Sequence, residues 1–232
     1  MDLDPTNQQI ALFLALYELL AKKRRQPAII GINGVDCSGK SVFAANFHDW
    51  LNRHGEHAVL VHLDDFHNPC AIRHQGDNPV EAYYHHAFDL ERLTRLVLEP
   101  LRRDGQLTVE LDVLNLDTDC YDIHRYYEIR HESVVLLEGV LLFRPPLLDF
   151  FDIRVFLHIG FEEVLKRAEL RDGPRFGSGI LTQYREKYIP VQQRYIHEYA
   201  PANLADLLID NTDVARPRIL SSIPIGGEDG NR

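Results

Sequence analysis

One short segment constrains the fold of this chain more than any other: GVDCSGKS, residues 34–41, which lies one residue after the apolar run from Pro27 to Ile32. Its two glycines lie five positions apart and are followed by a lysine and a serine. Glycines let the main chain curl and approach a ligand closely, because they lack a Cβ atom. The pattern GxxxxGK[ST] between a strand and a helix is typical of loops whose backbone N–H groups surround phosphate oxygens. The segment therefore predicts a phosphate-binding loop.

The residues on both sides of this segment fit that prediction. The apolar run that ends at Ile32 is typical of a buried strand, and residues 42–50 are compatible with a helix. The alternative is a glycine-rich turn that matches the pattern by chance, and these flanks argue against it. We expect the Lys40 ammonium to lie against the β- and γ-phosphates and the Ser41 hydroxyl to bind Mg²⁺. The residues predicted to bind nucleotide are Gly34, Val35, Asp36, Cys37, Ser38, Gly39, Lys40 and Ser41.

Short apolar runs alternate with longer amphipathic stretches along the rest of the chain. Buried runs separated by helices are typical of a mostly parallel sheet with helices on both faces. We therefore expect an α/β fold of the P-loop NTPase type, with three α/β/α layers. The expected strands are 28–32, 58–63, 134–137, 154–159 and a late 207–209, and the expected helices are 6–22, 41–53, 89–103 and 162–171.

Length and composition indicate one globular domain. A chain of 232 residues with 45% hydrophobic and 26% charged residues can bury a sizeable core. We expect a single domain over residues 1–232, with its core at about 26–214 and a frayed, glycine-containing tail at 224–232.

Charge and cysteine content narrow the classes of partner. The net charge of −10 argues against general binding to nucleic acid, which needs a basic surface. The three cysteines form no CxxC pair, so the sequence suggests neither a disulfide framework nor a zinc site. Acidic residues open the sequence, and no apolar run reaches the roughly 18 residues of a membrane span. We expect a soluble, cytoplasmic protein without membrane contact, and the sequence leaves a homo-oligomer open.

Two of the apolar runs end in carboxylates. Glu138 follows the run 134–137, and Asp64 and Asp65 follow the run 59–63. Carboxylates at the carboxyl ends of parallel strands face the ligand crevice of an open α/β sheet. Glu138 is then placed to serve Mg²⁺, and one of the two aspartates to orient a hydroxyl group that attacks a phosphate. The alternative is that these acids only solubilise the strand ends.

Arginines in the segment 162–175 are candidates for binding phosphates. Arg167 and Arg171 lie one helical turn apart, and Arg175 follows in a segment rich in glycine and proline. An arginine-bearing lid can close over a nucleotide and exclude water. The spacing fits equally well an exposed helix whose arginines pair with Glu163 and Glu169.

Taken in series, these pieces resemble the uridine kinase family of P-loop kinases, which is related to phosphoribulokinase and the bacterial pantothenate kinases. The resemblance spans roughly residues 28–213. It is carried, in order, by GINGVDCSGKS, HLDDFHNP, YYHHAFDLERLTRLVLEPL, VVLLEGVLLFRPPL, LRD and LLIDNTD. The phosphate loop alone indicates only nucleotide binding. Two further elements make the resemblance more specific: the acid-Asp-Phe element at residues 64–66 and the Leu-Glu-Gly-Val element at residues 137–140.

The resemblance implies ATP and Mg²⁺ as donor and cofactor, with a lid at about residues 171–183. Aligned on Phe66, the base that activates the acceptor hydroxyl is Asp64. The resemblance further implies roles in catalysis for Lys40 and Arg171, in phosphate binding for Arg171 and Arg175, and in metal binding for Ser41, Glu138 and Asp64.

At the acceptor site the chain departs from the family. His67, Tyr83 and Asn115 join Asp64 as predicted substrate-binding residues. Where nucleoside kinases of this type have an aromatic-Asp pair, this chain has Leu114 and Asn115. Tyr83-Tyr-His-His86 stands where the family has an acid for the ribose hydroxyls, with Asp77 as a candidate substitute. An aromatic shelf stabilises a stacked base by about 1–3 kcal/mol, so its loss bears on substrate choice.

Three functions remain open at this point. The first is an ATP-dependent kinase that phosphorylates the primary 5′-hydroxyl of a nucleoside such as uridine or cytidine. The second is a kinase of the same family for another small hydroxyl metabolite, such as a sugar, a sugar phosphate or a pantothenate-like acceptor. The third is a nucleotide-binding regulator with little catalysis, which the retention of both Asp64 and Glu138 argues against.

Overall fold

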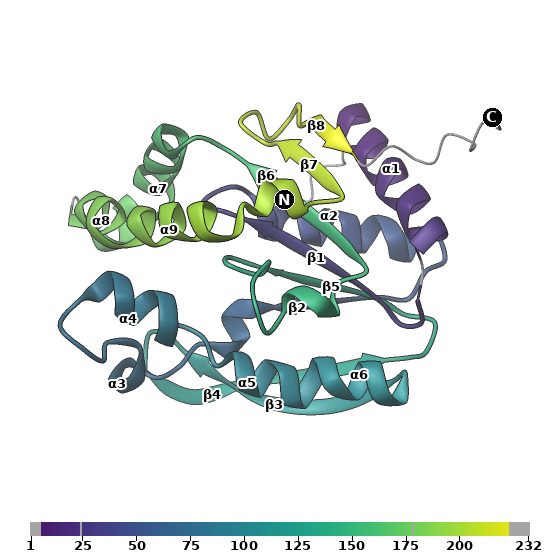
Figure 1. Cartoon of the computed structure of the whole chain (residues 1–232), viewed down its shortest axis with the longest axis horizontal. Coiled ribbons are helices and arrows are strands. Elements are labelled where there is room, and N and C mark those ends of the chain that lie inside the picture. Colours follow the sequence, from purple (N-terminus) through teal and green to yellow (C-terminus); the bar gives the residue numbers. More distant parts are fainter. Residues whose placement is uncertain (1–5, 24, 178, 223–232) are drawn as a thin grey trace, which may run out of the picture.

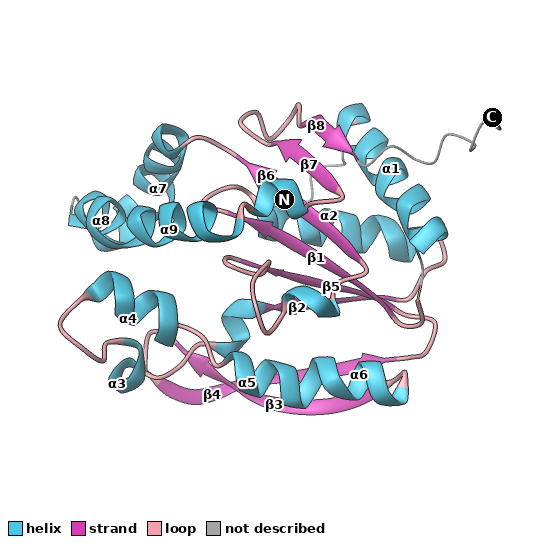
Figure 2. Ribbon diagram, viewed as in Figure 1, coloured by secondary structure: helices cyan, strands magenta, loops and turns pink. Residues whose placement is uncertain are grey.

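The computed structural model describes residues 6–23, 25–177 and 179–222, and a six-stranded sheet lies at its centre (Figures 1 and 2). The strand order is β2-β5-β1-β6-β7-β8, parallel except for β8, which runs antiparallel to β7. The tail predicted to fray, 224–232, lies outside the described residues. The strands are β1 Ala28–Gly34, β2 Ala58–His62, β5 Val134–Gly139, β6 Ile153–His158, β7 Leu207–Asp210 and β8 Arg218–Ser222.

The five expected strands are all confirmed, to within two residues at either end. Every residue of β1 and β5 is buried, as expected for strands covered on both faces. β1 lies between β5 and β6 in parallel register, with Ile32 opposite Glu138 and Val155. The loop that follows β1 therefore emerges at the middle of the sheet.

Helices cover both faces of the sheet, which confirms the three-layer prediction. Ile30 and Ile32 point to the face covered by α1 and α2, while the alternate residue Ile29 points to the core beneath α5, α6 and α9. No helix in the described ranges has the length and apolar composition that a membrane span needs. The helices are α1 Asn7–Lys23, α2 Lys40–Arg53, α3 Cys70–Arg73, α4 Pro79–His86, α5 Leu90–Leu93, α6 Glu99–Asp104, α7 Phe161–Phe176, α8 Gly179–Gln183, α9 Ile189–Tyr199 and α10 Pro201–Leu204.

A separate antiparallel hairpin, formed by β3 (Leu107–Asn115) and β4 (Cys120–Ile129), extends the second layer. The expected layers did not include it. Leu111, Val113 and Tyr127 bury one face of the hairpin in the core shared with α5 and α6. Figure 1 shows this hairpin packed against the α5–α6 segment at the bottom of the view.

The expected lid is helical in its described residues. α7 does not end at 171 but continues through Gly173 and Pro174 to Phe176. Proline inside a helix leaves the carbonyl four residues earlier without its usual donor. That carbonyl belongs to Leu170. Because Leu170 is 80% exposed, water can donate the missing hydrogen bond. A π-helical turn, Tyr184–Tyr188, then links α8 to α9.

Candidate active site

The loop between β1 and α2 needs its two glycines. Gly39 has φ of 87°, a left-handed conformation that disfavours other residues. A Cβ atom on Gly34 would lie 2.5 Å from Ser38 Oγ and 2.7 Å from the Leu157 carbonyl oxygen. Both glycines are therefore required by the observed backbone, as the sequence pattern predicts.

Side chains from α7, α9 and the end of β7 hold the loop in place. Arg167 donates to the Cys37 carbonyl at 3.1 Å, and Asn211 donates to the Ser38 carbonyl at 2.6 Å. Gln192 accepts from the backbone N–H of Asp36 at 3.1 Å and donates to its carboxylate. These bonds occupy loop carbonyls, while the first N–H groups of α2 have no intrahelical acceptor. The arrangement favours an anion at the start of the helix.

Three side chains meet at the base of the loop. The Ser41 hydroxyl lies 3.2 Å from both carboxylate oxygens of Glu138, which is 3% exposed. His62 Nδ1 lies 2.7 Å from the same carboxylate, and this hydrogen bond raises the pKa of His62 against the opposing effect of burial. Mg²⁺ prefers oxygen ligands and usually takes one or two from protein, with phosphates and waters completing its shell. The Ser41 and Glu138 oxygens fit that chemistry.

The two aspartates after β2 have different surroundings. Asp65 is buried and accepts hydrogen bonds from Tyr127 at 2.7 Å and from Arg125 at 3.2 Å. The Asp64 side chain is 69% exposed, and its only partner among the described ion pairs is His67, at 3.9 Å. Asp65 is thus engaged in packing the hairpin against β2. Asp64 is the carboxylate that is free to meet a ligand, and its role as the base stays a prediction.

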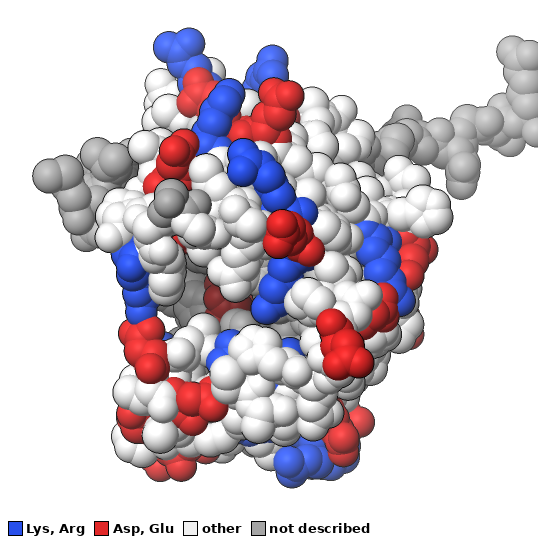
Figure 3. Space-filling model, turned by 90° about the vertical axis from the view of Figure 1, so that its left-hand side faces the viewer, with Lys and Arg blue, Asp and Glu red and all other residues white. Residues whose placement is uncertain are grey.

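A cavity of about 540 Å³ lies beside the loop, between the segment after β2 and the lid helices. Figure 3 looks into the hollow on this side of the molecule, where acidic and basic side chains line the walls. The structure thus brings together residues from four separate parts of the sequence. The predicted site residues that line this cavity are Asp36, Lys40, Ser41, Asp64, His67, Tyr83 and Arg171.

Contacts within the cavity already involve two of these residues. Lys40 Nζ donates to the Val35 carbonyl at 3.3 Å, within its own loop. Arg171 donates to Asp172 at 2.8 Å and to the Tyr184 hydroxyl at 3.0 Å. Lys40 thus has only a neutral carbonyl partner, which an incoming phosphate can replace. Arg171 is itself 61% exposed, so it can meet a phosphate while it keeps its bonds to Asp172 and Tyr184.

Arg175 and Asn115, two of the residues predicted to bind ligands, do not line this cavity, and their roles in binding stay predictions. Arg175 pairs with Asp117 and covers the ring of Phe176. The Asn115 side chain accepts from the backbone N–H of Asp117 at 3.0 Å in the hairpin turn. Leu114, which stands in the place of the aromatic shelf, is 2% exposed and packs inward.

The cavity also contains residues that the sequence analysis missed. Arg73, in α3, lies on one wall. Gln183, Tyr184, Lys187 and Tyr188 line the cavity as well. Their spacing is that of one helical face, so a periodicity search over residues 180–188 could have found them.

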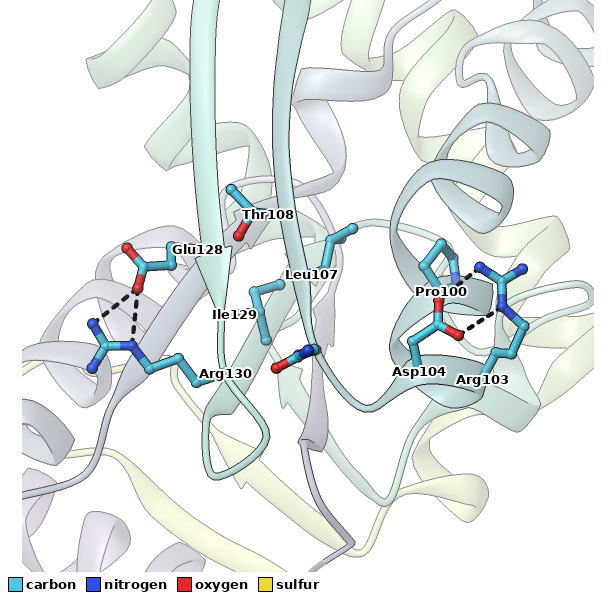
Figure 4. Close-up of a pocket in the computed structure, with 9 residues that line it drawn as sticks. Pro100, Arg103, Asp104, Leu107, Thr108, Glu128, Ile129 and Arg130 are labelled. Atoms are coloured by element: carbon cyan, nitrogen blue, oxygen red, sulfur yellow. Dashed lines mark hydrogen bonds and ion pairs between the residues drawn. The ribbon is translucent and has the colours of Figure 1, made fainter.

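A second hollow of about 600 Å³ lies between α6 and the start of the hairpin, and Figure 4 shows it close up. Its charged side chains pair with one another: Arg103 with Asp104 at 2.7 Å, and Arg130 with Glu128 at 2.9 Å. It contains no residue of the phosphate loop. The cavity beside the loop is therefore the candidate active site.

Known proteins resemble this chain in sequence. It is 26% identical over 193 residues to a uridine kinase from Ligilactobacillus salivarius, covering 76% of this chain and 83% of that protein. It is 26% identical over 215 residues to a uridine kinase from Shewanella denitrificans, covering 84% and 96%. No family model matches the chain.

Solved structures share the fold. A protein from Bacillus stearothermophilus described as a possible uridine kinase has a TM-score of 0.67, at 23% identity over 87% of this chain and 97% of that one. A D-glycerate 3-kinase from Cryptococcus neoformans has 0.66, at 14% identity over 92% and 97%. A protein from a Silicibacter species described as a putative fructose transport system kinase has 0.63, at 21% identity over 82% and 94%. At these identities the likeness concerns the fold alone.

Proposed function

We propose that the chain is a P-loop kinase similar to the uridine kinases, and that it transfers the γ-phosphoryl group of ATP to a hydroxyl group of a small acceptor. One arrangement carries this proposal. The phosphate loop, the Ser41 hydroxyl held on Glu138 and the exposed Asp64 all border the same cavity region. A nucleotide-binding site alone would not need the last of these groups.

Each group has a role that follows from its position. The loop amides, Lys40 and Arg171 would bind the phosphates and offset the charge that develops during transfer. Ser41, with Glu138 beside it, would hold Mg²⁺, which when bound would supply further positive charge to the phosphates. Asp64 would accept the proton of the attacking hydroxyl group.

A nucleoside such as uridine or cytidine, phosphorylated at its 5′-hydroxyl, is the first candidate acceptor. The names of the sequence relatives favour it. Tyr83 and Tyr188 contribute aromatic rings to the cavity, and their centroids lie 5.2 Å apart. Rings of this kind can stack on a base or a sugar.

A different small hydroxyl compound is the second candidate. Two observations favour it: Leu114 is buried, and the Asn115 side chain is used in the hairpin turn, so neither supports a base in the cavity. Two structural neighbours are also named for acceptors or pathways of this kind, glycerate and fructose.

ADP release tests the proposal directly. The full chain is incubated with ATP and Mg²⁺, and ADP is measured with uridine, cytidine, fructose, fructose 6-phosphate, glycerol or D-glycerate. We expect at least one acceptor to stimulate ADP release well above the acceptor-free rate, and the requirement for Mg²⁺ to be lost with EDTA. Tight ATP binding without stimulation by any acceptor would instead support a nucleotide-binding regulator.

A further inference from the structure

Two cations face the cavity on the side where the acceptor would bind. The phosphate loop follows β1 in the chain, and Asp64 follows β2. In the sheet, β2 lies beyond β5 from β1, so Asp64 lies to one side of the phosphate loop. Arg73 belongs to α3, which also follows β2, and therefore lies on the Asp64 side. Lys187, in the π-helical turn between α8 and α9, lines the same cavity.

Lys187 has no carboxylate partner among the described residues. Its ammonium lies over two aromatic rings, 5.1 Å from the centroid of Tyr83 and 5.3 Å from that of Tyr188. Burial lowers the pKa of Lys187, and the charge of Arg73 lowers it further. The cation is thus partly removed from water and placed near a like charge, and the two rings offset only part of this cost.

Arg73 keeps an unused hydrogen-bond donor. Its side chain is 18% exposed and reaches Asp119 at 3.3 Å through one terminal nitrogen. Its Nε is buried and has no partner among the described residues. A buried donor without an acceptor is unfavourable. The Arg73 residue lines the cavity, so an anion bound there can share its guanidinium with Asp119.

The carboxylates of the cavity do not neutralise this pair. Asp36 is bound to Gln192, and Asp172 is bound to Arg171. Asp64 is the remaining carboxylate, and no ion pair joins it to Arg73 or Lys187 within the described part of the chain. Lys187 therefore remains without a neutralising carboxylate, and Arg73 has only the ion pair with Asp119 at 3.3 Å.

We propose that the acceptor carries an anionic group, a carboxylate or a phosphate, which Arg73 and Lys187 bind while a hydroxyl group of the same molecule faces Asp64. This inference rests on the proposed kinase function and selects the second class of acceptor. In the transfer, the hydroxyl oxygen forms a bond to the γ-phosphorus, and the bond from that phosphorus to the bridging oxygen breaks. ADP leaves, and the hydroxyl proton passes to Asp64.

Binding of inorganic phosphate tests the inference without knowledge of the acceptor. The full chain is first saturated with Mg²⁺ and a non-hydrolysable ATP analogue, so that the nucleotide site is filled, and phosphate is titrated by calorimetry. We expect one bound phosphate per chain, and the Kd to rise about tenfold or more in Lys187→Gln or Arg73→Gln. The matched control is Arg185→Gln, which removes an exposed cation two positions from Lys187 outside the cavity lining.

The acceptor assay then separates the two proposals. Two results together support the inference. First, kcat/KM for D-glycerate or fructose 6-phosphate is at least tenfold above kcat/KM for glycerol or fructose. Second, Lys187→Gln raises the KM for that anionic acceptor and leaves the KM for ATP unchanged. Efficient transfer to uridine or another neutral acceptor, without phosphate binding, overturns the inference and leaves the kinase proposal intact. Absence of transfer to every acceptor overturns the kinase proposal and this inference with it.

Discussion

The Ser41 hydroxyl and the Glu138 carboxylate lie 3.2 Å apart, although 97 positions separate them in the chain. The contact exists because β1 and β5 are parallel neighbours, with Ile32 opposite Glu138. The loop after β1 therefore places Ser41 next to the carboxyl end of β5. His62, at the end of β2, binds the same carboxylate from the other side.

Removing the charge of Glu138 should weaken the response to Mg²⁺. In Glu138→Gln, the amide keeps the shape of the side chain but loses the negative charge, so we expect the Mg²⁺ concentration for half-maximal activity to rise by about 10- to 100-fold. A Mg²⁺ titration of ADP release measures this. Glu128→Gln, at the unrelated second hollow, is the matched control and should leave the titration unchanged. An unaltered titration in Glu138→Gln would remove Glu138 from the metal site.

The neighbouring aspartates provide a second, paired prediction. Asp64→Asn should lower kcat by about 10²- to 10⁴-fold, because the acceptor hydroxyl loses its base. Its thermal midpoint should stay near that of the parent, since the side chain is mostly exposed. ATP affinity, measured by calorimetry, should also be preserved. Wild-type turnover in Asp64→Asn would exclude Asp64 as the base.

Asp65→Asn should show the opposite pattern. It weakens the buried contacts with Tyr127 and Arg125, so we expect a loss of about 1–3 kcal/mol in the free energy of unfolding. Turnover per folded molecule should fall far less than in Asp64→Asn. Chemical denaturation and ADP release on the same preparations compare the two effects.

The sequence could place the loop between β1 and α2 because the strand, the glycines and the helix form a local pattern. The buried strand before Gly34, the loop glycines and the helix after Lys40 follow one another within about 25 residues, so spacing alone places them. The carboxyl ends of parallel strands meet at one edge of the sheet, which is why Glu138 could be placed near Ser41.

The acceptor wall could not be predicted in the same way. The register of the hairpin shifts between Val113 and Leu114, and a shift by one residue exchanges the two faces of a strand. An alignment by motif cannot detect such a shift, so it could not show that the Asn115 side chain accepts a hydrogen bond in the hairpin turn. Lys187 was not predicted, because the sequence indicated no helix between the expected helix 162–171 and the expected strand 207–209.

The backbone of the phosphate loop gives a third prediction. Gly34→Ala would place a methyl group 2.5 Å from Ser38 Oγ and 2.7 Å from a backbone oxygen, which cannot move freely. We expect overpacking to reduce the free energy of unfolding by about 1–3 kcal/mol and to weaken ATP binding as the loop is displaced. Gly160→Ala is the control, because a Cβ atom there meets nothing within 4 Å. Equal ATP affinity in Gly34→Ala and the parent would show that the loop conformation is not needed for binding.

The lid arginines give the last prediction, because the structure separates two residues that the sequence had grouped. Arg171 lines the cavity beside Lys40, whereas Arg175 pairs with Asp117 outside the cavity lining. Arg171→Ala should lower kcat by roughly 10²- to 10³-fold, the usual effect of removing one donor that stabilises transition-state charge. Arg175→Ala should change kcat by less than about threefold, because an exposed ion pair contributes little.

Steady-state kinetics on the two variants decide between this assignment and its reverse. Because both substitutions remove the same group from the same helix, general damage to α7 would lower both rates together, and circular dichroism would detect it. A large loss of kcat in Arg175→Ala alone would mean that α7 turns Arg175 into the cavity when nucleotide binds. Arg171 would then be the residue that only stabilises the lid, through Asp172 and Tyr184.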